Sequence, residues 1–186
     1  MKNLIVAIVL LISCSVPTGP EECFEVFERP VVNLPLTLRQ SNWIGVANQG
    51  SCVYATMVSL LRWQGRYKTA EDIRQTCGDG ANDTKLANVL DQKGIRYAFT
   101  NSGDVRFLEW SIRTRRGVGV AVPGRRSSHF VALVHLDSKD AIILDNNSIE
   151  RYEVIPREIF LTQWRQQGGW AFSVVYTPAA PLPMRR

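Results

Sequence analysis

The spacing of hydrophobic residues changes near residue 118. Before it, apolar side chains recur every three or four positions, which is typical of helices with one buried face. After it come short apolar runs bounded by turn residues, which are typical of strands. The pattern predicts helices over 52–64, 69–76, 83–93, 104–116 and 156–166, and strands over 118–122, 130–136, 141–144 and 170–176. This order predicts an α+β fold, with a helical half packed on an antiparallel sheet.

Turn and capping residues mark the ends of these elements. Thr69 opens a capping-box pattern, Asp83 or Thr84 caps the third helix, and Gly94 ends it. The turn 137–140 joins two strands that should pair as a hairpin. The proline-interrupted segment 30–38 is expected to be an extended strap or an edge strand.

Cys52 follows a glycine-containing turn and begins the first predicted helix. A thiol in the first helical turn meets unpaired N–H groups and the positive end of the helix dipole, and both favour the thiolate. In such a setting a cysteine pKa of about 8.5 can fall to about 3.5–7.5. A buried small side chain is the alternative interpretation of any one cysteine. Cys52 is therefore a candidate nucleophile that needs a partner elsewhere in the chain.

His129, one of two histidines, stands at the entrance of the strand 130–136. His135 lies at the far end of that strand, where we expect solvent around it. Asp145 ends the next strand, and the hairpin places the start of one strand beside the end of the other. His129 and Asp145 should therefore be within hydrogen-bond reach. Such a pair orients an imidazole and stabilises its charged form, which keeps a nearby thiolate ionised.

The chain of 186 residues is long enough for one domain with a sizeable core. Its net charge of +5 comes largely from arginine, and five arginines flank the segment before His129: Arg113, Arg115, Arg116, Arg125 and Arg126. A solvated basic face is the simpler interpretation, and a patch that attracts acidic substrates or lipid head groups is the alternative. Neither a zinc-ligand spacing nor a nucleic-acid-binding motif accompanies these charges, so no metal or nucleic acid is expected.

The N-terminus is typical of an export signal. A basic start precedes the apolar run Leu4–Ile12, which is too short to span a bilayer. The run ends in Leu11-Ile12-Ser13-Cys14, which resembles a bacterial lipobox, and this resemblance implies that Cys14 is lipidated. An ordinary signal peptide cut nearby is the alternative. Either way we expect the domain outside the cytoplasm, on a tether over residues 15–20.

Export leaves three cysteines in an oxidising compartment once Cys14 is lipidated. The economical arrangement is a disulfide between Cys23 and Cys77, with Cys52 as the free, reactive thiol. A pairing through Cys52 would be hard to reconcile with catalysis.

Five segments in order resemble papain-like cysteine peptidases, and most of all the branch of bacteriocin-processing, double-glycine leader peptidases. They cover roughly residues 41–176: the nucleophile helix 52–61, a helix followed by Gly-Ile over 83–95, the histidine strand 129–133, the acidic segment 143–145 and the closing strand 169–175. The resemblance implies a papain-like fold. It also implies Cys52 as nucleophile, His129 as acid–base and Asp145 as the residue that orients the ring.

Two departures from the family's pattern leave roles open. The family places an oxyanion-hole glutamine before the nucleophile where this sequence has Val46. Gln40 lies farther away, so Gln49 is our candidate, with a glutamine in a polar turn as the equal alternative. Asp145 also lacks the proline that often follows it in this branch. Asn146 therefore competes for the third role, which papain gives to an asparagine.

These features predict an exported, lipid-anchored cysteine peptidase that acts on peptide or protein substrates without a metal or organic cofactor. A cell-wall amidase or endopeptidase and a catalytically silent binding domain of the same fold are the alternatives. The expected organisation is a signal peptide over 1–13, a lipidated cysteine, tether and strap over 14–40, the papain-like domain over 41–177 and a tail over 178–186.

Overall fold

The computed structural model describes residues 30–44, 50–78, 80–124 and 127–175. The helices are α1 (Cys52–Trp63), α2 (Tyr67–Thr76), α3 (Asp83–Gln92), α4 (Val105–Arg113) and α5 (Arg157–Gln166), with a 3-10 turn η1 (Leu36–Leu38). The strands are β1 (Tyr97–Thr100), β2 (Val118–Pro123), β3 (Ser128–Leu136), β4 (Asp140–Leu144), β5 (Glu153–Pro156) and β6 (Ala171–Val174). The fold is α+β, as predicted.

One antiparallel sheet contains the six strands in the order β1-β6-β2-β3-β4-β5. Its centre is the pair β2 and β3, where Val122 lies opposite His129. The next pair, β3 and β4, brings Ala132 opposite Leu144 and shifts its register between Leu133 and His135. The predicted hairpin therefore exists, and the end of β4 lies near the start of β3.

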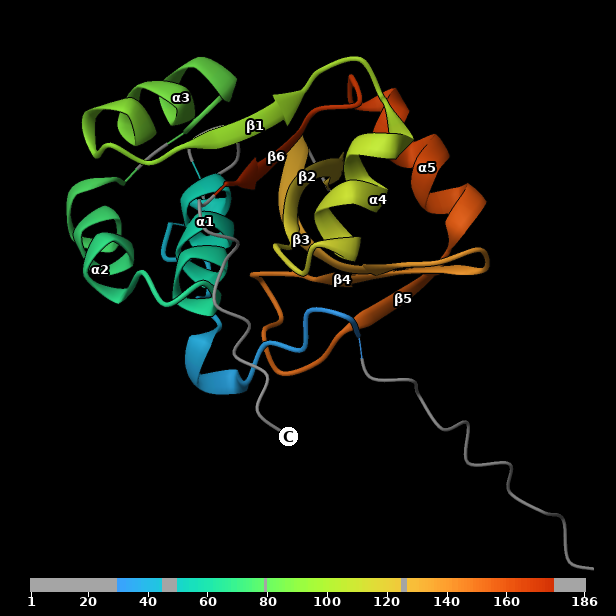
Figure 1. Ribbon diagram of the computed structural model, residues 1–186, viewed down its shortest axis with the longest axis horizontal. Helices are drawn as coiled ribbons and strands as arrows, with labels where there is room; N and C mark the ends of the chain where they lie inside the picture. Colours follow the sequence, from blue (N-terminus) through green and yellow to red (C-terminus); the bar gives the residue numbers. More distant parts are fainter. Residues whose placement is uncertain (1–29, 45–49, 79, 125–126, 176–186) are drawn as a thin grey trace, which may run out of the picture.

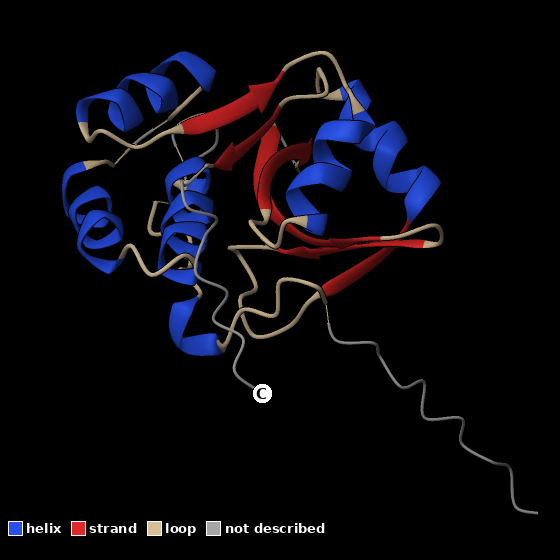
Figure 2. Ribbon diagram, viewed as in Figure 1, coloured by secondary structure: helices blue, strands red, loops and turns tan. Residues whose placement is uncertain are grey.

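Helices cover both faces of this sheet (Figures 1 and 2). On one face α1 packs against β2 and β3 through residues such as Met57 and Phe130, and α2 and α3 pack around α1. On the other face α4 and α5 bury Leu108 and Trp164 against Val131 and neighbouring strand residues. Because both faces are covered, the central strands are apolar at nearly every position.

Several predicted boundaries are wrong for local reasons. The second helix begins at Tyr67, because the chain turns from Gly65 directly into it, and the Thr69 capping box is not used. Asn82, and not Asp83 or Thr84, caps α3, because its extended backbone lets its side chain accept the N–H of Lys85 at 2.9 Å.

Two short strands, β1 and β5, were not predicted from the sequence. Neither carries an alternating pattern of fully buried residues, because each forms an edge of the sheet. The strap 30–38 forms no strand: it bends at Val31 and Val32 before η1, and the N–H of Val32 donates to the carbonyl of Val134. Among the residues that the structure describes, no helix is long and apolar enough to cross a membrane.

Candidate active site

Cys52 is the first residue of α1, and Ser51 is its N-cap. The thiol is half-buried and hydrogen-bonds the His129 ring, and the N–H groups of Phe130 and Val53 donate to it. Burial alone raises the pKa of the Cys52 thiol, but these hydrogen bonds and the charge of the ring outweigh burial, so the pKa lies below its ordinary value. The position favours a thiolate, as the sequence predicted.

His129 is the second residue of β3, and its ring lies between a thiol and a carboxylate. Its Nε2 lies 2.7 Å from Oδ1 of Asp145, so Nδ1 is the nitrogen that is left for Cys52. Burial alone lowers the pKa of His129. The hydrogen bonds to Asp145 and Cys52 and the charges of both groups outweigh burial and raise the pKa from 6.5 to about 9.

Asp145 directly follows the last residue of β4, and the structure brings it to the ring as the sequence predicted. Burial alone raises the pKa of Asp145, but the hydrogen bond from His129 and the N–H of Asn147, which donates to Oδ1 at 2.7 Å, hold it below its ordinary value. Asp145 therefore stays ionised at neutral pH and supplies a full negative charge to the ring.

Together the pKa directions favour a thiolate–imidazolium pair. The thiol pKa is lowered and the imidazole pKa is raised, so the proton resides on the ring over a window that ends near pH 9. The two groups interact directly, so they titrate as a pair and not as two independent sites. This arrangement can supply a nucleophile and an acid at the same carbonyl group.

Asn146, the alternative third member, points away from the ring. Its side chain is buried, and Nδ2 lies 2.7 Å from the carbonyl of Phe130, 3.0 Å from Oγ1 of Thr56 and 3.1 Å from the carbonyl of Cys52. It therefore connects α1 to β3 beneath the site and is a structural group here.

Three residues around the site were not predicted from the sequence: Asn42, Ser51 and Asn147. Nδ2 of Asn147 lies 3.2 Å from Nε2 of His129, and Asn42 hydrogen-bonds both Ser51 and Asn147. Asn147 follows Asp145 in a polar run that leaves a strand, and that run was the one available signal. Asn42 carries no such signal in the sequence.

Other predicted residues lie elsewhere or outside the described residues. The side-chain amide of Gln40 donates to the carbonyl of Ser41, and its backbone N–H donates to the hydroxyl of Ser59. Because Ser59 lies two turns along α1 from Cys52, Gln40 is not part of the site. Cys77 carries a free thiol at the end of α2. The expectation that solvent surrounds His135 is wrong, because its side chain is mostly buried and its Nε2 lies 3.1 Å from Oδ2 of Asp137. Six residues named in the predictions lie outside the described residues: Cys14, Cys23, Val46, Gln49, Arg125 and Arg126.

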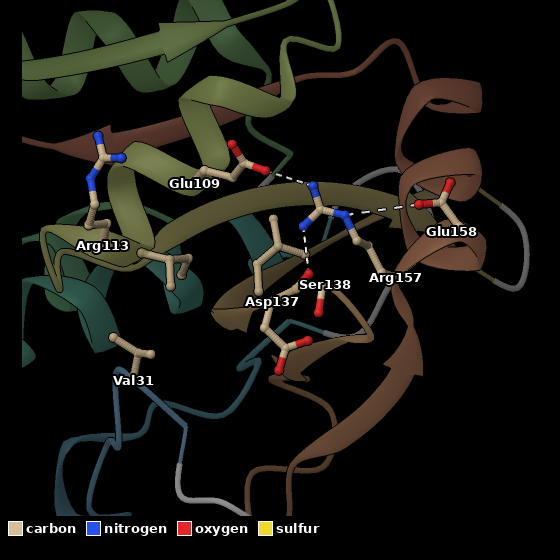
Figure 3. Close-up of a pocket in the computed structure, with 9 residues that line it drawn as sticks. Val31, Glu109, Arg113, Asp137, Ser138, Arg157 and Glu158 are labelled. Carbon is tan, nitrogen blue, oxygen red and sulfur yellow. Dashed lines mark hydrogen bonds and ion pairs between the residues drawn. The ribbon is translucent and has the colours of Figure 1, made fainter.

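An open hollow of about 590 Å³ lies at the opposite end of β3 from His129, beside the last residue, Leu136 (Figure 3). Arg157 crosses it and bonds Glu109 at 2.7 Å and the carbonyl of Asp137 at 2.6 Å. Arg157 also lies 4.0 Å from Glu158. The hollow and His129 lie at opposite ends of β3, so the hollow does not extend the candidate active site.

The sequence matches no protein-family model and no curated protein. Among solved structures, the chain is similar to a C39-like peptidase from Bacillus anthracis at 16% identity and a TM-score of 0.60, over 79% of this chain and 96% of that one. The chain has the fold of the C39-like peptidases. The C39-like fold also occurs in the peptidase domain of Streptococcus ComA, a bi-functional ABC transporter involved in quorum sensing. That domain is 14% identical, with a TM-score of 0.55 over 73% of this chain and 97% of that one. The predicted papain-like fold is thereby confirmed.

Proposed function

We propose that the protein is a cysteine peptidase in which Cys52 is the nucleophile, His129 the acid–base and Asp145 the residue that orients the ring. The observation that supports the proposal is the position of the His129 ring, whose Nε2 lies 2.7 Å from Oδ1 of Asp145 and which also interacts with the Cys52 thiol. A catalytically silent binding domain has no need of a thiol with a lowered pKa beside a histidine with a raised one.

The reaction begins when the Cys52 thiolate attacks the carbonyl carbon of a peptide bond, and the carbonyl oxygen becomes an oxyanion. The charged His129 ring then gives its Nδ1 proton to the leaving nitrogen, and the carbon–nitrogen bond breaks. The acyl group remains on sulfur as a thioester. The neutral ring next takes a proton from water, the resulting hydroxide attacks the thioester, and the thiolate is released as the acid product departs.

The oxyanion needs hydrogen-bond donors close to Cys52. The N–H of Cys52 occupies the first position of α1, where helix geometry provides no carbonyl partner for it, so it is free to bind the oxyanion. We assign the second donor to the side chain of Gln49, three residues earlier in the chain.

We further propose that the enzyme is exported and lipid-anchored through Cys14, and that its substrate is a peptide or protein. We also propose that the Cys77 thiol, which is free in the structure, forms a disulfide with Cys23 once the protein reaches an oxidising compartment. The lipobox-like Leu11–Cys14 supports the anchor. Intact and reduced mass spectra of the mature protein test both modifications. A first residue without lipid would contradict the anchor, and a disulfide that includes Cys52 would contradict the reactive thiol.

Cleavage of an unstructured peptide library by purified protein tests the function, with Cys52→Ala and His129→Ala as the variants and cell-wall muropeptides as a parallel substrate set. We expect peptide products from the wild type and none from either variant. Products from muropeptides alone would favour the amidase alternative. Equal cleavage by Cys52→Ala would contradict the assignment of the nucleophile.

A further inference from the structure

Asn42 connects the loop that leads to Cys52 with the loop after β4 that carries Asp145. Its N–H donates to the carbonyl of Asn146 at 2.7 Å, and its Nδ2 donates to Oδ1 of Asn147 at 3.2 Å. Its Oδ1 accepts the N–H of Ser51 at 3.1 Å and also the Ser51 hydroxyl hydrogen. Asn42 thus contacts the residue directly before Cys52 and the two residues directly after Asp145.

Ser51 fixes the path of the loop that leads to the nucleophile. It is completely buried, and its hydroxyl oxygen accepts the N–H groups of Trp43 and Ile44 at 2.8 and 2.9 Å. With two N–H groups as donors to this oxygen, the hydroxyl hydrogen is available for Asn42. The position of Asn42 is therefore set by the buried hydroxyl of Ser51, the residue directly before Cys52.

Asn147 contacts both members of the ring–carboxylate pair. Its N–H donates to Oδ1 of Asp145 at 2.7 Å, and its side-chain nitrogen lies 3.2 Å from Nε2 of His129. Although its side chain is exposed, it lies against the ring nitrogen that faces Asp145. A displacement of Asn147 would therefore move the carboxylate relative to the ring.

The donors also determine how the two amides are oriented. Because the Ser51 N–H can only donate, Asn42 turns its oxygen to Ser51 and its nitrogen to Asn147. Asn147 then turns its oxygen to Asn42 and its nitrogen to His129. Since Nε2 carries the hydrogen that it donates to Asp145, the contact of Asn147 with the ring is a packing contact and not a hydrogen bond.

We propose that Asn42 and Asn147 form a bridge whose function is to position the His129–Asp145 pair against Cys52. The bridge is the side-chain hydrogen bond between these two asparagines. It rests on the proposed function only in that the positioned groups are the catalytic ones. The hydrogen-bonded series then runs from Ser51 through Asn42 and Asn147 to Asp145. It therefore connects the residue before Cys52 to the residue that follows β4 and orients the ring.

The test uses Asn42→Ala, Asn147→Ala and the double variant in the full mature protein. The first readout is the rate of iodoacetamide alkylation of Cys52 as a function of pH, which needs no substrate. The second is the separate measurement of kcat and KM on a cleaved peptide. Asn88→Ala, the same change at an exposed position on α3, is the control.

We expect each single variant to raise the apparent pKa of the thiol and to lower kcat about 10- to 100-fold with KM nearly unchanged, because a small misplacement of reacting groups has costs of this size. The double variant should be no worse than the more impaired single variant, because the two side chains act through one bond. Circular dichroism checks folding, and Asn147→Ala, at the exposed position, decides the outcome if Asn42→Ala unfolds.

Two results would overturn the bridge. One is an unchanged thiol titration and kcat in folded Asn147→Ala. The other is a double variant whose losses multiply. If the wild type cleaves no peptide, the proposed function fails, but the alkylation comparison still decides whether the bridge positions the ring.

Discussion

Replacement of Asp145 by asparagine should lower the pKa of His129 while keeping a hydrogen-bond acceptor beside the ring. The side chains of His129 and Asp145 are 15% and 21% exposed, so water screens their attraction only in part. A carboxylate at this range typically shifts a pKa by about 1–3 units. We therefore expect the pKa of His129 to fall from about 9 by about that amount.

The free energy involved sets a limit on the catalytic effect. The rise of the His129 pKa from 6.5 to about 9 corresponds to about 3 kcal/mol, to which Asp145 and the Cys52 thiolate both contribute. Loss of the whole amount would lower kcat/KM about 300-fold. Asp145→Ala, which also removes the acceptor, should come closer to that limit than Asp145→Asn.

Proton NMR can follow this titration directly, because the chain has only two histidines. His135 lies at the other end of β3 and serves as the internal reference. The pH dependence of kcat/KM should move in the same direction, with its basic limb shifted to lower pH in both variants. An unchanged His129 titration in Asp145→Ala, or an equal shift in Asn146→Ala, would refute our reasoning about the charge.

Asn146→Ala should cost about 1–3 kcal/mol of unfolding free energy, because it removes a buried amide that donates to the carbonyl of Phe130 and leaves that carbonyl with the Thr56 hydroxyl as its side-chain donor. The same change should leave the thiol titration nearly unchanged; urea unfolding and alkylation measure the two effects. Gly119→Ala should destabilise by about 1–3 kcal/mol, since a Cβ there would lie 2.4 Å from Cε1 of Phe130; a melting temperature equal to that of the wild type would contradict this. In Cys52→Ala the Asp145 carboxylate still favours the charged form of His129 in the folded state alone, so this stabilisation is complete below pH 6.5 and is lost as the pH rises through a folded pKa that is lower than the wild-type value, because the hydrogen bond and charge of Cys52 are gone. In the folded wild type the ring has gained a proton and the thiol has lost one, so folding hardly changes the number of bound protons. The urea midpoint should therefore fall less steeply between pH 6.5 and 9 in the wild type than in Cys52→Ala.

The sequence predicted the elements and contacts that depend on local pattern. The helix α1 follows from its three- and four-residue spacing, but the expectation of a single buried face is wrong, because the sheet, the strap and α2 surround the helix and bury ten of its twelve residues. The contact of His129 with Asp145 follows from one hairpin joined by a short turn. That contact survives the register shift within the hairpin, because both residues lie beyond it at the open end.

What the sequence did not predict depends on distant segments. The bond between Asn42 and Asn147 joins residues 105 positions apart, and no periodicity encodes the path of the loop that brings them together. Likewise, β1 and β5 are strands only because a neighbouring strand pairs with each of them. Their four residues are too few for a pattern to distinguish them from loops.

The most direct test of the central claim is the pKa of the Cys52 thiol, measured by the rate of iodoacetamide alkylation from pH 4 to 10 in the wild type and in His129→Ala. The hydrogen bond and charge of the ring should keep the wild-type thiol ionised below the pH at which an ordinary cysteine ionises. In His129→Ala the titration should move to higher pH. A single titration at the ordinary cysteine pKa, the same in both proteins, would contradict the thiolate–imidazolium pair and the peptidase mechanism built on it.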